Sequence, residues 1–385
     1  MDHTRQVELA RRILEAREAG GHAPSGPAPV QNPVADYTDG EQLALERDQL
    51  FRRAAIFAGL RADAPEPGSY FTLDVVGLSL LLVRGLSGEL RAFQNLCRHR
   101  GAALVEGRGR AGSHLVCPYH GWSYELDGRL AAMSERWAFE GTLPCGRGLI
   151  TLPVAEQDGM IWVRPIPGDP IDLPGLLAGA GLELAGFGFG SYQRFESVEL
   201  RQRMNWKLVM DTFMEQYHLP VLHCDSLAPM FLGTLALYDA FGDHGRLVAV
   251  RRSIAELETV PEADWSVLPH TTLLYFLFPN TVLIYQQDHV QSWQVFPGES
   301  VEEARMLVTL YVPEPQDSRN ARSHFARNLK LLVDVTTQED FALGERMQRG
   351  YENGCQRGVI FGRNEVALAH YHRTIRRRIG LPEDS

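Results

Sequence analysis

The stretch "CRHRGAALVEGRGRAGSHLVCPYHGW", residues 97–122, contains two cysteines and two histidines in an uneven pattern. One residue separates Cys97 from His99, and two residues separate Cys117 from His120. Each pair follows a strand-like segment, so the tips of two hairpins can carry the pairs to one place. Thiolates and imidazoles are ligands of transition metals. The stretch therefore predicts a metal site built from two loops.

Three interpretations of the two pairs differ in the ligands that they require. Unrelated core cysteines and surface histidines account poorly for two Cys/His pairs so close together. Structural zinc sites usually pair cysteine with cysteine and histidine with histidine, whereas each pair here contains one of each. A Rieske 2Fe-2S cluster holds one iron with two cysteines and the other with two histidines. Because each loop must then supply one ligand to each iron, the mixed pairs favour the cluster.

The same stretch resembles the Rieske motif of ring-hydroxylating oxygenases, as does "GMIWV" at 159–163. The segment "CPYHGWSY" at 117–124 accounts for most of this resemblance. It implies that Cys97 and Cys117 bind one iron of a 2Fe-2S cluster, and that His99 and His120 bind the other.

The apolar and turn residues predict an α+β chain in three parts. Residues 1–45 read as an N-terminal helix and linker arm, with a Gly/Pro-rich segment after the helix. Short strand-like segments between turns predict a small all-β Rieske domain over 46–165. Mixed segments over 166–385 predict a catalytic mononuclear non-haem iron domain of helix-grip (START-like) kind, an antiparallel sheet flanked by helices. Single helices are expected at 205–219, 317–349 and 363–379.

Composition narrows the classes of partner and compartment. The 385 residues have 44% hydrophobic and 22% charged residues and a formal net charge of −10. This argues against nucleic acid or a membrane as a partner. Five cysteines, an odd number, fit a reducing compartment better than a disulfide scaffold. The acid-containing N-terminus lacks a signal-peptide pattern, so a cytoplasmic protein is expected. The apolar stretch "TTLLYFLFPNTVLIY" is broken by Pro279-Asn280 and predicts a buried hairpin.

A second constellation lies in "NWKLVMDTFMEQYHLPVLH", residues 205–223. His218 and His223 are five residues apart, a poor shared face on a continuous helix. Pro220 lies between them, so a helix break can bring His223 back toward His218. Two histidines and a distant carboxylate form the facial triad of non-haem Fe(II) oxygenases. The alternative is two ordinary histidines near a helix end.

The carboxylate of such a triad must come from far downstream. Acidic residues cluster in "VDVTTQEDFALGERMQRG", and four are candidates: Asp334, Glu339, Asp340 and Glu345. Most of them are expected on a solvated helix face. The "HYH" at 370–372 is also expected on a helix surface.

Residues 205–223 resemble the mononuclear-iron motif of the same oxygenase alpha subunits. The resemblance implies that His218 and His223 bind Fe(II), and that Asp340 is the third ligand. It also implies that Glu215 is a catalytic residue that bridges His218 to His120 of the adjacent chain in a ring of three subunits. Asp211 is a second catalytic candidate. Asp211-Thr212 departs from the family pattern, since relatives often have Glu-Asn there.

The two iron sites together imply a terminal oxygenase that hydroxylates a substrate with O2. Electrons reach it from NADH or NADPH only through a separate reductase, with or without a ferredoxin. The expected assembly is a homotrimer, or a hexamer with a small beta subunit. The alternatives are oxidative O- or N-demethylation within the same family, and a non-catalytic Rieske electron carrier.

An apolar or aromatic substrate, mono- or dihydroxylated, is expected from the side chains near His218. The expected pocket lining is apolar and aromatic: Met210, Phe213, Leu222, residues 273–278, Tyr285 and Trp293. Arg251 and Arg252 are candidate partners of a substrate carboxylate, but the favoured interpretation is that they are exposed strand residues.

Overall fold

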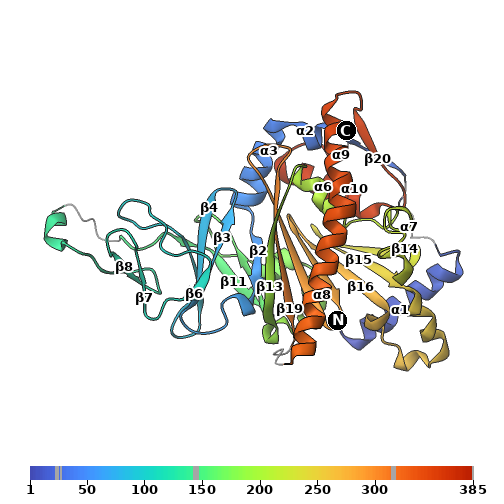
Figure 1. The fold of residues 1–385 in the computed structure, drawn as a ribbon, viewed down its shortest axis with the longest axis horizontal. Helices are drawn as coiled ribbons and strands as arrows, with labels where there is room; N and C mark the ends of the chain where they lie inside the picture. The colour runs from blue at the N-terminus through green and yellow to red at the C-terminus, as the bar shows by residue number, and fades with distance from the viewer. Residues whose placement is uncertain (22–25, 27, 142–146, 314–317, 384–385) are drawn as a thin grey trace. The chain divides into compact units, whose positions relative to one another are not determined.

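The computed structural model describes the chain except residues 22–25, 27, 142–146, 314–317 and 384–385 (Figure 1). The chain divides into two compact units. The larger comprises residues 1–47, 177–187 and 193–385, and the smaller comprises 48–176 and 188–192. The predicted domain boundaries at 45 and 165 lie near this division, and residues 1–47 group with the larger unit. No helix in the described part of the chain is long and apolar enough to cross a membrane.

The smaller unit is built from short antiparallel strands in three sheets. The five-stranded sheet has the order β10(Thr151–Leu152), β5(Leu90–Gln94), β4(Leu78–Arg84), β3(Ser69–Val75), β6(Arg108–Arg110). One three-stranded sheet has the order β11(Val154–Gln157), β12(Met160–Val163), β2(Ile56–Leu60), and the other has the order β7(His114–Val116), β8(Ser123–Glu125), β9(Leu130–Ala132). The smaller unit also contains the helical turns η2(Arg61–Asp63), η3(Arg136–Phe139) and η4(Phe189–Ser191).

The tight turn between β3 and β4 illustrates how the sequence closes these hairpins. Val75 pairs with Leu78, so Val76 and Gly77 form a two-residue loop. Both have positive φ, 46° and 84°, the backbone geometry of a type I′ hairpin turn. Strand segments ending in such turns confirm the predicted all-β architecture.

The larger unit is centred on a seven-stranded antiparallel sheet. The strand order is β13(Gln193–Gln202), β19(Ala304–Val312), β18(His289–Pro297), β17(Thr281–Gln286), β16(Thr271–Leu277), β15(His244–Arg251), β14(Phe231–Phe241). Strands β14 to β19 form a meander in chain order, and β13 pairs with the free edge of β19. The hairpin of β16 and β17 is the one predicted from the broken apolar stretch. Strand β14 and the pair β1(Val30–Pro33)–β20(Gly358–Phe361) were not predicted.

Helices flank this sheet, as predicted. Two helical segments span the boundary between the units: the π-helical η1(Arg47–Arg53) and α4(Leu173–Leu177). The helical segments within the larger unit are α1(His3–Glu18), α2(Ala35–Thr38), α3(Gly40–Glu46), α5(Ala180–Ala185), α6(Trp206–Asp211), α7(Leu219–Leu222), η5(Ala228–Met230), η6(Arg252–Thr259), η7(Glu262–Asp264), η8(Leu268–His270), α8(Arg319–Val335), η9(Thr336–Phe341), α9(Ala342–Glu352) and α10(Val366–Ile379). Phe325 of α8 contacts Phe195 of β13 and His289 of β18, with ring centroids 6.0 and 5.9 Å apart.

Two predicted helices are interrupted in the structure. The single helix expected over 205–219 is wrong, because α6 ends at Asp211 and a separate helix, α7, begins at Leu219. Pro220 lies in the first turn of α7, where proline fits. The long helix expected over 317–349 is instead α8, the π-helical segment η9 and α9. Such π segments are frequent at functional sites.

A buried ion pair fixes the start of α6 in the larger unit. Lys207 Nζ lies 2.6 and 2.7 Å from the two carboxylate oxygens of Glu46 on α3, and both side chains are at most 1% exposed. Trp206 Nε1 and Gln42 Nε2 donate to the same carboxylate at 2.7 and 3.1 Å. Buried charges persist when their hydrogen-bonding capacity is used in this way.

We expect Lys207→Met to destabilise the protein strongly, by about 3–5 kcal/mol, because Glu46 is left as a buried charge without its partner. The measurement is the shift in the urea unfolding midpoint, followed by tryptophan fluorescence. The exposed Lys330, which pairs with Asp334 on a helix surface, provides the control, and Lys330→Met should cost less than about 1 kcal/mol. A loss for Lys207→Met as small as that of the control would contradict the prediction.

Candidate functional site: two metal-ligand clusters

The two cysteine loops of the smaller unit close with the same backbone turn. Gly101 N–H donates to Cys97 O at 2.9 Å, and Gly121 N–H donates to Cys117 O at 3.1 Å. Both glycines have positive φ, 78° and 69°, which residues with a Cβ rarely adopt. Each glycine is four residues after its cysteine, so the loops match although their histidines stand at different spacings.

These loops bring all four predicted ligands together. The imidazole rings of His99 and His120 have centroids 4.7 Å apart. Cys97 and Cys117 are buried and form no disulfide. Tyr124 OH lies 3.3 Å from Cys97 Sγ. Burial raises the pKa of the Cys97 thiol, and the hydrogen bond of Tyr124 opposes this rise.

The atoms of the two histidines fit an iron cluster. The Nδ1 atoms of both His99 and His120 are buried and find no hydrogen-bond partner in the described residues. Unpartnered buried nitrogens are costly, unless a group absent from the protein chain binds them. Two buried thiols and two such nitrogens form the donor set of a Rieske cluster. His99 also stacks on Trp122, at 4.8 Å and 8° between the rings.

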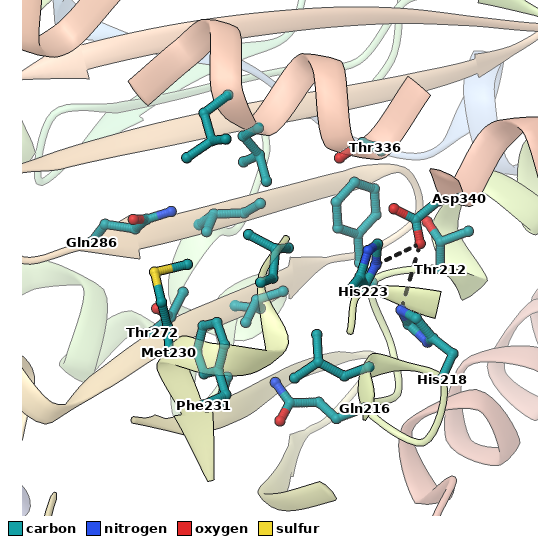
Figure 2. Close-up of a pocket in the computed structure, with 18 of the residues that line it drawn as sticks. Thr212, Gln216, His218, His223, Met230, Phe231, Thr272, Gln286, Thr336 and Asp340 are labelled. Atoms are coloured by element: carbon teal, nitrogen blue, oxygen red, sulfur yellow. Dashed lines mark hydrogen bonds and ion pairs between the residues drawn. The ribbon is translucent and has the colours of Figure 1, made fainter. Parts of the chain in front are cut away.

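A second cluster lies in the larger unit, where His218, His223 and Asp340 each offer a ligand atom within 4.8 Å of the others. Asp340 Oδ1 lies 3.1 Å from His223 Nε2 and 3.5 Å from His218 Nε2 (Figure 2). His218 is the N-cap and His223 the C-cap of the four-residue helix α7. The expected helix break at Pro220 between the two histidines is wrong, because Pro220 lies inside α7, and this single helical turn carries one histidine at each end.

The opposite ring nitrogens of the two histidines are held by glutamates. Glu215 accepts a short hydrogen bond from Nδ1 of His218, and Glu339 lies 2.7 Å from Nδ1 of His223. Ser226 Oγ donates to the same Glu339 oxygen at 2.9 Å. A carboxylate on the distal nitrogen fixes the tautomer and orientation of a metal-binding histidine. Both Nε2 atoms are therefore directed at Asp340.

The electrostatics around His223 suit a bound cation. Burial disfavours a charged His223, but the hydrogen bonds and charges of Asp340 and Glu339 outweigh it and raise the pKa of His223. Because His223 is only 2% exposed, water screens the negative charges of Asp340 and Glu339 around its ring only weakly. A metal ion is the group that such a set of donors commonly binds.

The other acidic candidates lie elsewhere. Asp334 pairs with Lys330, and Glu345 accepts from Arg203 N at 3.1 Å. Asp211 accepts hydrogen bonds from Tyr37 OH at 2.7 Å and from His372 Nε2 at 2.9 Å. Asp211 thus supports the back of the site, close to but not within the three-residue cluster.

The expectation that "HYH" at 370–372 lies on a helix surface is wrong for two of its three residues. Tyr371 and His372 are 3% and 2% exposed. Tyr371 OH donates to Pro279 O at 2.7 Å, and His372 contacts Asp211. The helical face of α10 that carries them packs inward, which the local sequence did not reveal.

A cavity of about 230 Å³ adjoins the cluster. Its sheet wall is one face of β15, β16 and β17, because residues two apart on a strand share a face. Register pairs Ala249 with Thr272 and Leu274 with Ile284. The remaining lining residues are Thr212, Phe213, Glu215, Gln216, Leu219, Leu227, Met230, Phe231, Arg251, Gln286, Asn328, Leu331, Leu332 and Thr336.

The expected pocket lining is correct only in part. Phe213 and Leu274 line the cavity, but Tyr285 does not, since it lies one residue out of phase with Ile284 and Gln286. Trp293 packs against Phe213 with centroids 5.2 Å apart. Figure 2 shows Thr272 and Gln286 at the end of the pocket away from His218 and Asp340.

Comparison with protein families matches both parts of the chain. The family described as "Ring hydroxylating alpha subunit (catalytic domain)" matches residues 189–381, just over half of the chain. The family described as "Rieske (2Fe-2S) domain" matches residues 56–139. Each match contains one of the two ligand clusters.

Curated relatives extend this likeness. The chain is 26% identical to the oxygenase subunit of glycine betaine monooxygenase from Chromohalobacter salexigens, over 83% of this chain and 78% of the relative. It is 27% identical to the chloroplastic choline monooxygenase of Amaranthus tricolor, over 88% and 76%. The chain spans 60% of the length of two further glycine betaine monooxygenase subunits from Pseudomonas aeruginosa.

A solved structure shares the fold. The quaternary ammonium Rieske monooxygenase CntA, in complex with its substrate γ-butyrobetaine, superposes with a TM-score of 0.76. The superposition covers 91% of this chain and 96% of CntA at 20% identity. At this identity the likeness concerns the fold.

We expect the two clusters to lose metal independently. His223→Ala should lose one iron per chain and all oxygenation while the protein keeps its red-brown colour, and Asp340→Ala should behave in the same way. Cys117→Ser should bleach the protein. The measurement is iron and acid-labile sulfide per chain, with an expected three irons and two sulfides in the parent protein.

Asp334→Ala, on the surface of α8, provides the control and should keep all three irons. Full iron content and turnover in Asp340→Ala would assign the carboxylate ligand to another residue. Stoichiometric zinc without sulfide in anaerobically prepared parent protein would contradict the cluster itself.

Proposed function

The chain belongs to the ring-hydroxylating alpha-subunit family, and on that premise we propose that it hydroxylates a carbon bonded to the nitrogen of a small quaternary ammonium compound. It is a Rieske-type oxygenase, an oxidoreductase with a 2Fe-2S cluster and a mononuclear non-haem iron. It uses O2, an organic substrate and electrons that a separate reductase takes from NADH or NADPH.

We assign the cluster to Cys97, His99, Cys117 and His120, and the mononuclear iron to His218, His223 and Asp340. When bound, the mononuclear Fe(II) supplies activation of O2 and the cluster supplies electrons one at a time. One oxygen atom enters a C–H bond of the substrate. The other leaves as water, which consumes two electrons from the reductase and two protons from solvent.

The cavity beside the three-residue cluster is the observation that carries the substrate proposal. Its volume of about 230 Å³ is below the usual range of pockets for drug-sized ligands, so it favours a small substrate. The phenyl ring of Phe213 lines it, and aromatic faces attract quaternary ammonium groups. The named relatives act on glycine betaine and choline. A quaternary ammonium substrate thus replaces the apolar or aromatic substrate expected from the sequence.

The protein's own side chains hold the site in a state ready for chemistry. Glu215 and Glu339 orient the two histidines, and Ser226 holds Glu339. The apolar walls limit water around the reacting carbon, which protects a reactive centre from side reactions.

Glu215 is also our candidate for the electron route between subunits of a homotrimer. Its side chain is 14% exposed, and it accepts from His218 Nδ1 and from the backbone N–H groups of Tyr217 and His218. A carboxylate has about four acceptor positions, so one remains for His120 of the adjacent chain. Inter-subunit electron transfer is described for a quaternary ammonium Rieske monooxygenase of the same fold, which superposes with a TM-score of 0.78.

We expect the purified holoenzyme, with a surrogate reductase and NADH, to oxygenate quaternary ammonium compounds. Glycine betaine, choline and γ-butyrobetaine would be compared with an arene and an aryl methyl ether. The measurement is O2 consumption together with mass-spectrometric identification of oxygenated or demethylated products. Turnover of the arene or ether with none of the ammonium compounds would overturn the proposed substrate class.

We expect Glu215→Gln to keep both metal sites and the trimer but to lower product formation by about 100-fold. The neutral amide keeps the size of the side chain and removes the charge that accepts from two histidines. The direct measurement is single-turnover reoxidation of the reduced cluster by O2 in the presence of substrate. Glu199→Gln, on β13, provides the control. Reoxidation of Glu215→Gln at the parent rate would mean that electrons cross through other residues.

A further inference from the structure

The end of the cavity away from the metal cluster contains an arginine. Arg251 is the last residue of β15 and lies on the same sheet face as Ala249, two residues earlier. Its Nη2 donates to Thr272 Oγ1 at 3.1 Å. Since Figure 2 labels Thr272 at the end away from His218 and Asp340, the guanidinium group lies at that end too.

The guanidinium group of Arg251 has little to stabilise its charge. Its Nε is buried and has no hydrogen-bond partner in the described part of the chain. Thr272 is neutral, and the other contact is the face of Phe231, 5.8 Å from ring centroid to guanidinium carbon. Burial lowers the pKa of Arg251, and the charge of Asp288 offsets this only in part. Asp288 itself is held by His289 Nδ1 and His324 Nε2, each at 2.7 Å.

The buried arginines in the described part of the chain are paired with carboxylates, whereas Arg251 is only partly buried. Arg246, on the same strand, bonds Glu183 at 2.6 Å and also contacts Asp239. Arg84 lies 2.9 Å from Glu156, and Arg376 lies 2.7 Å from Asp36. Within the described residues no ion pair of Arg251 is present. The fold therefore supplies counter-charges for arginines that support structure, and leaves this one to face the cavity.

We propose that Arg251 binds a carboxylate of the substrate, so that the substrate class is a trimethylammonium carboxylate rather than an amino alcohol. This inference rests on the proposed function for the position of the nitrogen, which lies at the metal end. A planar guanidinium binds a carboxylate with two parallel hydrogen bonds. Arg251 lines the cavity, so its guanidinium group can form such a pair there.

The walls between the two ends suit the chain of such a molecule. Leu274 and Ile284 of the sheet face the cavity together with Leu331 and Leu332 of α8. These side chains accommodate methylene groups and offer no hydrogen bonds. A substrate charged at both ends and apolar in the middle matches this arrangement, and anchoring one end fixes which carbon lies at the metal.

The test separates the carboxylate from the ammonium group. Binding to the oxidised holoenzyme is measured by isothermal titration calorimetry with γ-butyrobetaine, its methyl ester, and the isosteric acid in which carbon replaces the nitrogen. The parent protein should bind both acids more tightly than the ester. Arg251→Gln should weaken both acids by about 10- to 100-fold and leave the ester unchanged, because one charge-assisted pair is lost.

Two further variants complete the comparison. Arg251→Lys keeps the charge without the planar fork and should restore part of the affinity. Arg252→Gln changes the neighbouring exposed arginine, whose Nε donates to Pro229 O at 3.1 Å, and should bind all three probes as the parent does. Iron content and the cluster spectrum verify that each variant is folded.

The outcomes distinguish this inference from the proposed function. Equal affinity of the parent for acid and ester, no binding of either acid, or parental affinity of Arg251→Gln for the acids would each overturn the role of Arg251. Binding of the carbon isostere as tight as that of γ-butyrobetaine, with loss in Arg251→Gln, would support the arginine anchor while removing the case for a quaternary nitrogen.

Discussion

The hydrogen bonds from two glutamates to two imidazoles determine the geometry of the larger unit's metal cluster. With Glu215 on Nδ1 of His218 and Glu339 on Nδ1 of His223, both histidines present the same nitrogen to Asp340. A rotated ring or the other tautomer would separate the donors. The cluster thus depends on carboxylates that need not touch the metal, which is the usual role of outer partners in metal sites.

Two short backbone elements, α7 and η9, position the histidines and carboxylates of this cluster. Helix α7 has four residues, and its two caps are the histidines. The π-helical segment η9 brings Glu339 and Asp340, adjacent in sequence, onto the two nitrogens of one imidazole. Helix α6, which leads into this region, has in its first turn Lys207, whose charge is neutralised by Glu46. The irregular element α7 thus follows a regular helix, α6, that the buried Lys207–Glu46 ion pair holds in place.

The sequence was most informative where the structure is local. The two cysteine loops are five-residue turns closed by glycine, so residue type and spacing alone predicted Cys97, His99, Cys117 and His120 as neighbours. A helix break at Pro220 was also predicted, but the chain leaves the helix earlier, after Asp211, and Pro220 lies in the first turn of the next helix. Asp340 was chosen over Glu339 by resemblance. The structure separates their roles, because Asp340 lies at Nε2 of His223 and Glu339 lies at Nδ1. His223 is 117 residues from Asp340 in sequence, so this geometry is not visible in the sequence.

Long-range and phase-dependent features were less accessible from the sequence. Burial of His372 depends on Asp211, 161 residues away, and nothing in "HYH" indicates which face of the helix packs inward. The cavity wall could not be predicted because a shift of one residue along a strand exchanges the two faces. For that reason Tyr285 was expected in the cavity where Ile284 lies. Arg251 was noticed, but its lack of a counter-charge depends on contacts between strands.

The network of Tyr37, Asp211 and His372 has a consequence for how the protein is made. Tyr37 OH lies 2.7 Å from Asp211 and 3.2 Å from His372, although 335 residues separate it from His372. Synthesis proceeds from the N-terminus, and domains generally fold as units as they emerge. The loops at 97–122 are complete early, whereas the hydrogen bonds of His372 to Tyr37 and Asp211 cannot form until α10 has left the ribosome. The loops that carry Cys97 and Cys117 are therefore synthesised well before the last partner of this network.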